Sequence, residues 1–249
     1  MKEDRQPQRT DMPLTMLLPN VVTITALCAG LTAIRMGFHG QFKGAVIMIL
    51  IACILDGMDG KLARLLRSES PMGAELDSLA DAVNFGVAPA LLVYAFAMQD
   101  TTGAGWIAAL VYAVTCVMRL ARFNLDSKSE TSTPSGSRFV GVPAPAGAFL
   151  VLLPLFLSFQ ANDPDLIPPV LVGFYMIGIG LLMISRIPTF SFKKTRVARK
   201  SVKFLLLGFV FLAAALLTQT WITLIAMEFA YAVSIVWAWY TRDNTEAAS

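Results

Sequence analysis

The stretch Asp56-Gly-Met-Asp-Gly-Lys-Leu-Ala-Arg64, followed by Gly73-Ala-Glu-Leu-Asp77-Ser-Leu-Ala-Asp81, places four aspartates at the facing ends of two apolar segments. Asp56 and Asp59 are three residues apart and Asp77 and Asp81 are four apart, so each pair shares one face of a helix. The link at 67–72 is short, so the two helices are expected to be antiparallel neighbours. Ionisable groups at membrane depth are costly and are usually functional. The stretch therefore predicts a helical hairpin that gathers four carboxylates at one depth.

The rest of the chain has the composition of a membrane protein. Its 249 residues are 56% apolar and 15% charged, whereas a soluble domain carries roughly 25% charged residues. The deficit lies in long apolar runs, several of them near the ~20 residues that cross a bilayer core. We expect an all-α polytopic helical bundle of about eight transmembrane segments, at 17–37, 43–66, 75–98, 104–123, 143–160, 166–185, 204–219 and 221–240.

The basic residues predict the orientation of these spans. All but Arg35 and Lys43 of the 20 Lys and Arg residues fall on one side if the spans alternate, and an excess of basic residues marks the cytoplasmic side. We expect a multi-pass protein of the cell (inner, cytoplasmic) membrane, with both termini and the acidic cluster on the cytoplasmic side. The expected organisation is a cytoplasmic segment at 1–16, one transmembrane catalytic domain at 17–240 and a cytoplasmic tail at 241–249. The limits of the last two spans stay open, because Gln219 and Thr220 alone separate them.

Four carboxylates at one depth predict a metal site. They repel one another, and divalent cations offset that repulsion. Oxygen-only ligands suit Mg²⁺, Mn²⁺ or Ca²⁺. We expect two cations, Mg²⁺ or Mn²⁺, with Ca²⁺ able to occupy the site without supporting turnover. The expected ligands are Asp56, Asp59, Asp77 and Asp81.

The residues beside the acids favour a phosphate-bearing substrate. Gly60 and Ala63 are small enough for a ligand to lie close to the helix, and Arg64 is placed to meet a phosphate or carboxylate. A metal site at the border of lipid and water suits a diphosphate attached to a lipid. The leaving group would be a nucleotide, and the acceptor a small alcohol deprotonated by a nearby carboxylate.

Two further roles for the acids stay open, one in transport and one in structure. Membrane carboxylates also serve ion or proton transporters, and Lys61 or Arg64 could form a structural ion pair with them. Against transport, the acids cluster at one depth, and the outer halves of the two spans carry none. The single histidine, His39, and the cysteines inside apolar runs are not placed to form a phosphoryl-enzyme, which favours direct in-line attack by the acceptor.

The full pattern Asp56-x-x-Asp59-Gly60-x-x-Ala63-Arg64-x(8)-Gly73-x-x-x-Asp77-x-x-x-Asp81 resembles the signature of the CDP-alcohol phosphatidyltransferases. The resemblance implies a helical membrane enzyme that binds a CDP-linked lipid and two divalent ions, releases CMP and forms a homodimer. Within the family the chain resembles the integral-membrane (type II) phosphatidylserine synthases. The similarity is carried by Leu18-Pro-Asn-Val-Val-Thr23, the stretch from Gly73 to Pro89, Arg119-Leu-Ala-Arg-Phe-Asn124, Phe139-Val-Gly-Val-Pro-Ala-Pro145 and Ser185-Arg-Ile-Pro-Thr-Phe190.

The resemblance also assigns roles to residues. Asp56, Asp59 and Asp77 should bind the metals, and Asp81 should be a ligand of the second metal and the general base for the acceptor hydroxyl. The CDP-lipid contacts would come from Asn20, Thr23, Asp56, Gly60, Ala63, Arg64 and Gly73.

The acceptor pocket has no comparable signature. A serine carboxylate would pair with an arginine, and Arg119 and Arg122, with Asn124 close by, lie at the expected depth; snorkelling at a helix end accounts for both arginines as well. Ser78, Glu75 and Asn84 are candidates for the ammonium or the hydroxyl.

We therefore expect transfer of the phosphatidyl group from CDP-diacylglycerol to L-serine, releasing CMP. The expected partners are these substrates, membrane lipids and a second copy of the chain, with no nucleic acid. The alternatives are a phosphatidylglycerophosphate, phosphatidylinositol-phosphate or phosphatidylcholine synthase and, from another class, a metal-coupled transporter.

Overall fold

The computed structural model describes residues 17–101, 103–128, 139–185, 188–189 and 202–246. Two short strands, β1 (Phe139–Val140) and β2 (Pro188–Thr189), pair antiparallel. The expected all-α class is confirmed by the helices, which are α1 (Leu18–Phe38), α2 (Phe42–Leu66), α3 (Pro71–Asp81), the π-helix η2 (Ala82–Val87), α4 (Ala88–Ala97), α5 (Ala104–Lys128), α6 (Ala144–Val151), α7 (Leu153–Ala161), α8 (Pro169–Ile184), α9 (Val202–Thr218) and α10 (Thr220–Glu246).

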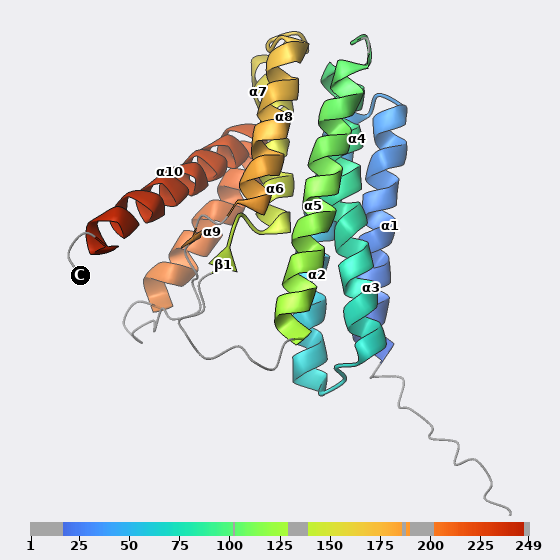
Figure 1. The fold of residues 1–249 in the computed structure, drawn as a ribbon, viewed down its shortest axis with the longest axis vertical. Coiled ribbons are helices and arrows are strands. Elements are labelled where there is room, and N and C mark those ends of the chain that lie inside the picture. Colours follow the sequence, from blue (N-terminus) through green and yellow to red (C-terminus); the bar gives the residue numbers. More distant parts are fainter. Residues whose placement is uncertain (1–16, 102, 129–138, 186–187, 190–201, 247–249) are drawn as a thin grey trace, which may run out of the picture.

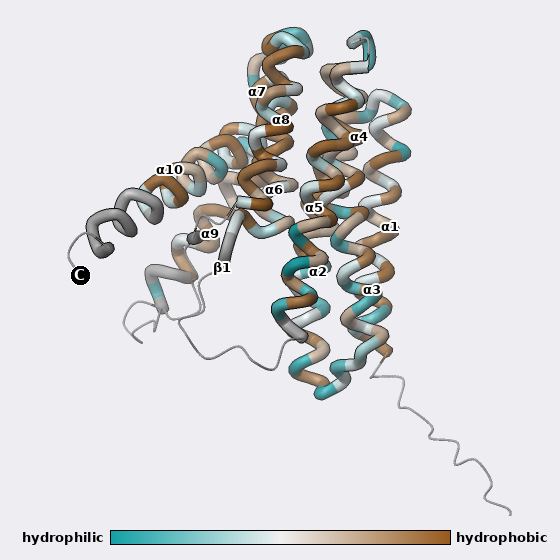
Figure 2. Tube along the Cα trace, viewed as in Figure 1, coloured by the Kyte–Doolittle hydropathy of each residue, from teal (hydrophilic) through white to brown (hydrophobic). Residues whose placement is uncertain are grey.

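Several of these helices are long and apolar enough to cross a membrane. In the described residues they are 18–38, 71–97, 104–126, 144–161 and 220–237, with two shorter apolar helices at 169–184 and 206–218. Figure 2 shows hydrophilic residues gathered toward the helix ends and apolar residues along their middles. The chain is therefore a multi-pass membrane protein, and the count of eight spans stays a prediction. Of the predicted termini, 1–16 lies outside the described residues and 241–249 is described up to Glu246, within α10.

The first helices, α1 to α4, form one side of the bundle. α1 packs along α2 and also contacts α3, η2 and α4 (Figure 1). On the other side, α5 packs on α8, while α10 contacts α7 and α9 and is inclined to the other helices in Figure 1. The core between them holds fully buried large side chains, among them Phe85, Tyr112 and Phe156.

The link between α2 and α3 is fixed by local chemistry. Arg67 ends α2 in the left-handed conformation, with φ of 50°. Ser70 caps α3 by accepting a hydrogen bond from the Gly73 N–H at 3.0 Å, and Pro71 begins the helix, where its missing N–H costs nothing. The chain therefore reverses within a few residues and brings the second acidic stretch back toward the first.

Two spans are interrupted near prolines, and each interruption is compensated by a tyrosine. Pro89 has no N–H to donate to the carbonyl of Phe85, four residues earlier, and the Tyr112 hydroxyl donates to that carbonyl at 3.0 Å. Pro154 and Leu150 have the same relation, and the hydroxyl of Tyr175 donates to the Leu150 carbonyl at 2.7 Å. Lipid offers no hydrogen bonds to a backbone carbonyl. The two tyrosine hydroxyls therefore supply the donors that these carbonyls lack.

Candidate metal centre and nucleotide pocket

Three of the four predicted carboxylates converge in space. One oxygen from each of Asp56, Asp59 and Asp77 lies within 4.8 Å of the other two. Asp59 is buried, whereas Asp56 and Asp77 are partly accessible. Hard oxygen donors at this spacing, from two different helices, have the chemistry that Mg²⁺ and Mn²⁺ require. The donor set therefore fits divalent metal ions.

Asp81 completes the cluster from one turn further along the third span. Its carboxylate lies against that of Asp56, and it interacts electrostatically with Asp77 and with Arg119 of α5. One of its oxygens is buried without a hydrogen-bond partner among the described residues. Asp81 thus sits between the three converging acids and the cationic end of α5.

α1 supports the cluster from the side. The Thr23 hydroxyl donates a hydrogen bond to Asp59 Oδ2 at 2.6 Å, and both side chains are buried. The sequence predicts that Thr23 contacts the nucleotide, but no local pattern indicates a bond between residues 36 positions apart. The bond therefore orients the Asp59 carboxylate from α1.

A pocket of about 290 Å³ adjoins the acids and is shared by α1, α2 and the start of α3. Asp59 and Asp77 line it on the side of the acidic cluster. A Cβ added to Gly60 would meet nothing within 4 Å, so this glycine leaves open space. The structure brings together in this lining the following residues predicted to contact the CDP-lipid: Asn20, Thr23, Gly60, Ala63, Arg64 and Gly73.

The predicted serine-pocket residues fall into different environments. Arg119 is half-buried and faces Asp81. The amide of Asn124 donates to the Ser78 hydroxyl at 2.7 Å, which ties the end of α5 to the helix between Asp77 and Asp81. Arg122 is exposed and donates to the Ile184 carbonyl of α8 at 3.3 Å. Arg119 is therefore the arginine of this pair that lies beside the acids.

Glu75 and Asn84 differ in their exposure. Glu75 is exposed on α3. Asn84 is fully buried in η2, where its side chain is aimed at Gly30 of α1 and its amide has no hydrogen-bond partner among the described residues. Any side chain at Gly30 would collide with Asn84, so α1 approaches η2 closely at this point.

α10 contributes buried polar groups that are not among the predicted site residues. Glu228 is 2% exposed, and neither carboxylate oxygen has a hydrogen-bond partner among the described residues. Tyr231, one turn further, interacts electrostatically with Arg119. A signal was present in the sequence, because Glu228 is the single charged residue between 204 and 240. An acid inside an apolar span points to a functional or structural role.

The family model described as CDP-alcohol phosphatidyltransferase matches residues 16–185, and a second model of that description, numbered 2, matches residues 201–235. Relatives named CDP-diacylglycerol--serine O-phosphatidyltransferase include one from Mycobacterium leprae, 48% identical over 69% of this chain and 57% of that protein. One from Bacillus subtilis is 37% identical over 71% of this chain and 92% of that protein. An archaetidylserine synthase from Methanothermobacter thermautotrophicus is 29% identical over 68% of each chain. The chain spans about three-fifths of the length of the mycobacterial relatives it matches.

Proposed function

The chain belongs to the CDP-alcohol phosphatidyltransferase family, and we propose that it transfers the phosphatidyl group of CDP-diacylglycerol to the hydroxyl of L-serine and releases CMP. The observation that carries the proposal is the position of the Asp56, Asp59 and Asp77 carboxylates beside a pocket that contains Gly60 and Arg64. Relatives that bear the name of this activity, from several bacteria, support serine as the acceptor.

Asp56, Asp59, Asp77 and Asp81 would hold two divalent cations, Mg²⁺ or Mn²⁺. Enzymes of this family generally depend on divalent metal ions, and the converging acids fit that chemistry. When bound, such ions offset negative charge on the phosphate oxygens during transfer.

The pocket beside the acids would receive the cytidine diphosphate part of the lipid. Arg64 can donate charge-assisted hydrogen bonds to a phosphate. The open space at Gly60 lets a flat ligand lie close to α2. The diacylglycerol part would extend from this end of α2 into the surrounding bilayer, since side chains such as Ile54 and Met58 are exposed on that helix.

Serine would enter from the side of α5. Arg119 would pair with its carboxylate, and Asp81, which faces Arg119, would accept the proton of the hydroxyl. The serine oxygen then forms a bond to the lipid-side phosphorus, the bond from that phosphorus to the CMP oxygen breaks, and CMP leaves with the electron pair. No phosphoryl-enzyme is needed for this in-line route.

The catalytic end of the bundle is proposed to face the cytoplasm of a cell with the protein in its cytoplasmic membrane. The distribution of Lys and Arg along the sequence supports this orientation. A homodimer is proposed from the family resemblance.

The test is incorporation of labelled serine into lipid by the purified full chain, supplied with CDP-diacylglycerol, with and without EDTA. We expect stoichiometric CMP release, loss of activity with EDTA and recovery with Mg²⁺ or Mn²⁺. Glycerol 3-phosphate, inositol phosphate and choline serve as competing acceptors, and preferential use of any of them would assign a different member of the family. Ion flux without CMP release would instead support a transporter.

A further inference from the structure

A second cavity lies at the opposite end of α1 and α2 from the aspartates. It has a volume of about 580 Å³, within the range of small-molecule sites. Its walls come from helix ends: Met36 near the end of α1, Phe42 at the start of α2, Phe96 near the end of α4 and Phe159 near the end of α7. Ends of membrane-spanning helices lie where a bilayer passes from acyl chains to headgroups, so the cavity opens at that depth.

One wall of the cavity is aromatic. The rings of Phe42 and Phe96 meet edge to face with centroids 5.1 Å apart, and Phe96 meets Phe159 in the same way at 5.6 Å. The ring of Trp221 in α10 packs against the Phe159 ring, with the two centroids 4.7 Å apart, and supports it. Three linked rings from three helices make a rigid apolar surface, which is suited to an acyl chain.

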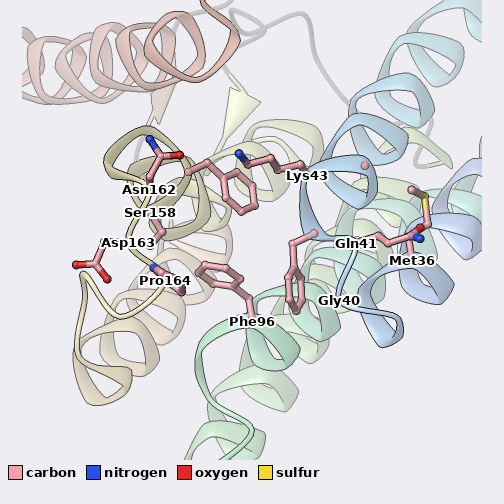
Figure 3. A pocket seen from close by; sticks show the side chains of 12 residues that line it. Met36, Gly40, Gln41, Lys43, Phe96, Ser158, Asn162, Asp163 and Pro164 are labelled. Carbon is pink, nitrogen blue, oxygen red and sulfur yellow. The ribbon is translucent and has the colours of Figure 1, made fainter.

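The two charged residues that line the cavity are placed differently relative to its aromatic wall. Lys43 is the one cation in this lining, and its ammonium lies 5.7 Å from the centre of the Phe159 ring, where the ring face attracts it. Asp163 is the one acid in the lining. Figure 3 shows its carboxylate pointing away from Phe96 and Lys43, and one of its oxygens accepts the Asp165 N–H at 3.0 Å. The aromatic wall therefore has a positive group beside it, and the negative group points elsewhere.

We propose that this cavity binds one anionic phospholipid of the leaflet opposite the acidic cluster, with its phosphate at Lys43 and an acyl chain along the Phe42, Phe96 and Phe159 rings. The pairing of a cation with an adjoining apolar wall matches the two parts of such a lipid. A free phosphate would leave the rings uncovered. A quaternary ammonium headgroup would need the face of the Phe159 ring, and the Lys43 ammonium already occupies that face and would repel it.

The test is lipid binding by the full chain in detergent, measured by native mass spectrometry with phosphatidylglycerol or phosphatidylcholine of the same acyl chains. We expect one tightly retained phosphatidylglycerol per chain and weaker retention of phosphatidylcholine. Lys43→Gln should weaken phosphatidylglycerol binding about fivefold, as expected for one basic residue near a headgroup. It should weaken phosphatidylcholine binding less, because the choline charge offsets the charge of the phosphate. Lys43→Arg should restore the preference.

Arg35→Gln is the matched control. It removes one positive charge from an exposed residue on α1, at the same end of the bundle, that does not line the cavity. The proposal is overturned if Lys43→Gln binds phosphatidylglycerol as the unmodified chain does, or if Arg35→Gln weakens binding equally. It is also overturned if phosphatidylcholine is retained as well as phosphatidylglycerol, or if glycerol 3-phosphate displaces the lipid. None of these outcomes depends on the proposed transferase activity.

Discussion

Thr23 Oγ1 lies 2.6 Å from Asp59 Oδ2 and joins α1 to the acidic cluster on α2 through a buried hydrogen bond. A ligand carboxylate that is held in this way is oriented before any metal binds, and such supporting contacts typically contribute strongly to metal affinity. The proposed nucleotide pocket and the proposed metal ligands are thus coupled, because Thr23 also lines that pocket.

Thr23→Val should lower metal affinity by about tenfold or more, because it removes this support while keeping the shape of the side chain. The measurement is the Mn²⁺ concentration that gives half-maximal serine incorporation, together with direct Mn²⁺ binding. Thr25→Val is the control, since its exposed hydroxyl donates only within its own helix, to the Val21 carbonyl. Equal effects of the two substitutions would contradict a specific role for Thr23.

Gly60→Ala should weaken nucleotide binding without unfolding the protein. The added methyl group would occupy open space in the pocket lining, so the KM for CDP-diacylglycerol should rise. Gly57→Ala is the matched control, because a Cβ there also meets nothing within 4 Å and the residue does not line the pocket. Both alanines should stabilise α2 by up to about 1 kcal/mol, and the proposal for Gly60 fails if both raise the KM alike.

Asp81→Asn should reduce turnover by at least about 100-fold, because the amide cannot accept the serine proton. Binding of CDP-diacylglycerol should be largely retained, since Asp81 lies outside the pocket lining. The measurements are kcat and equilibrium binding of the lipid in the presence of Mn²⁺. Equal loss of both would make Asp81 chiefly a metal ligand.

Arg119→Gln should raise the KM for serine by about tenfold or more, the usual effect of losing a hydrogen bond to a charged group. The KM for CDP-diacylglycerol should change little. Arg122→Gln should have a small effect on both constants, because Arg122 is exposed and donates to the Ile184 carbonyl. A larger serine effect from Arg122→Gln would move the carboxylate site to that residue.

Tyr112→Phe should destabilise the protein by about 1–3 kcal/mol, because the Phe85 carbonyl loses its side-chain donor in a buried, dry environment. The measurement is the unfolding midpoint in detergent. Tyr94→Phe is the control, since the Tyr94 ring packs edge-on against Trp106 and that contact survives removal of the hydroxyl. Equal midpoints for Tyr112→Phe and the unmodified chain would show that the carbonyl finds another donor.

A large part of the acidic site was predictable from the order of residues. The spacing of Asp56, Asp59 and Asp77 and the short link between their helices led to the expectation that these acids converge, and they do. The same local reasoning led to the all-α class, because long apolar runs in lipid must satisfy their backbone within helices. The proposed serine pocket is less predictable from local patterns. Arg119 and Arg122 look alike in sequence, and the tertiary structure alone separates the half-buried Arg119 beside Asp81 from the exposed Arg122.

The sequence by itself determined the all-α class, the acidic faces and the identity of the hard oxygen donors, since these follow from composition, periodicity and chemistry within a few residues. The tertiary structure decided which distant partners those groups meet: Thr23 with Asp59, Tyr112 with the carbonyl freed by Pro89, and Lys43 with the ring of Phe159. The physical reason is that each of these contacts joins separate helices. Their relative rotation and distance depend on the packing of the whole bundle, which no local pattern encodes.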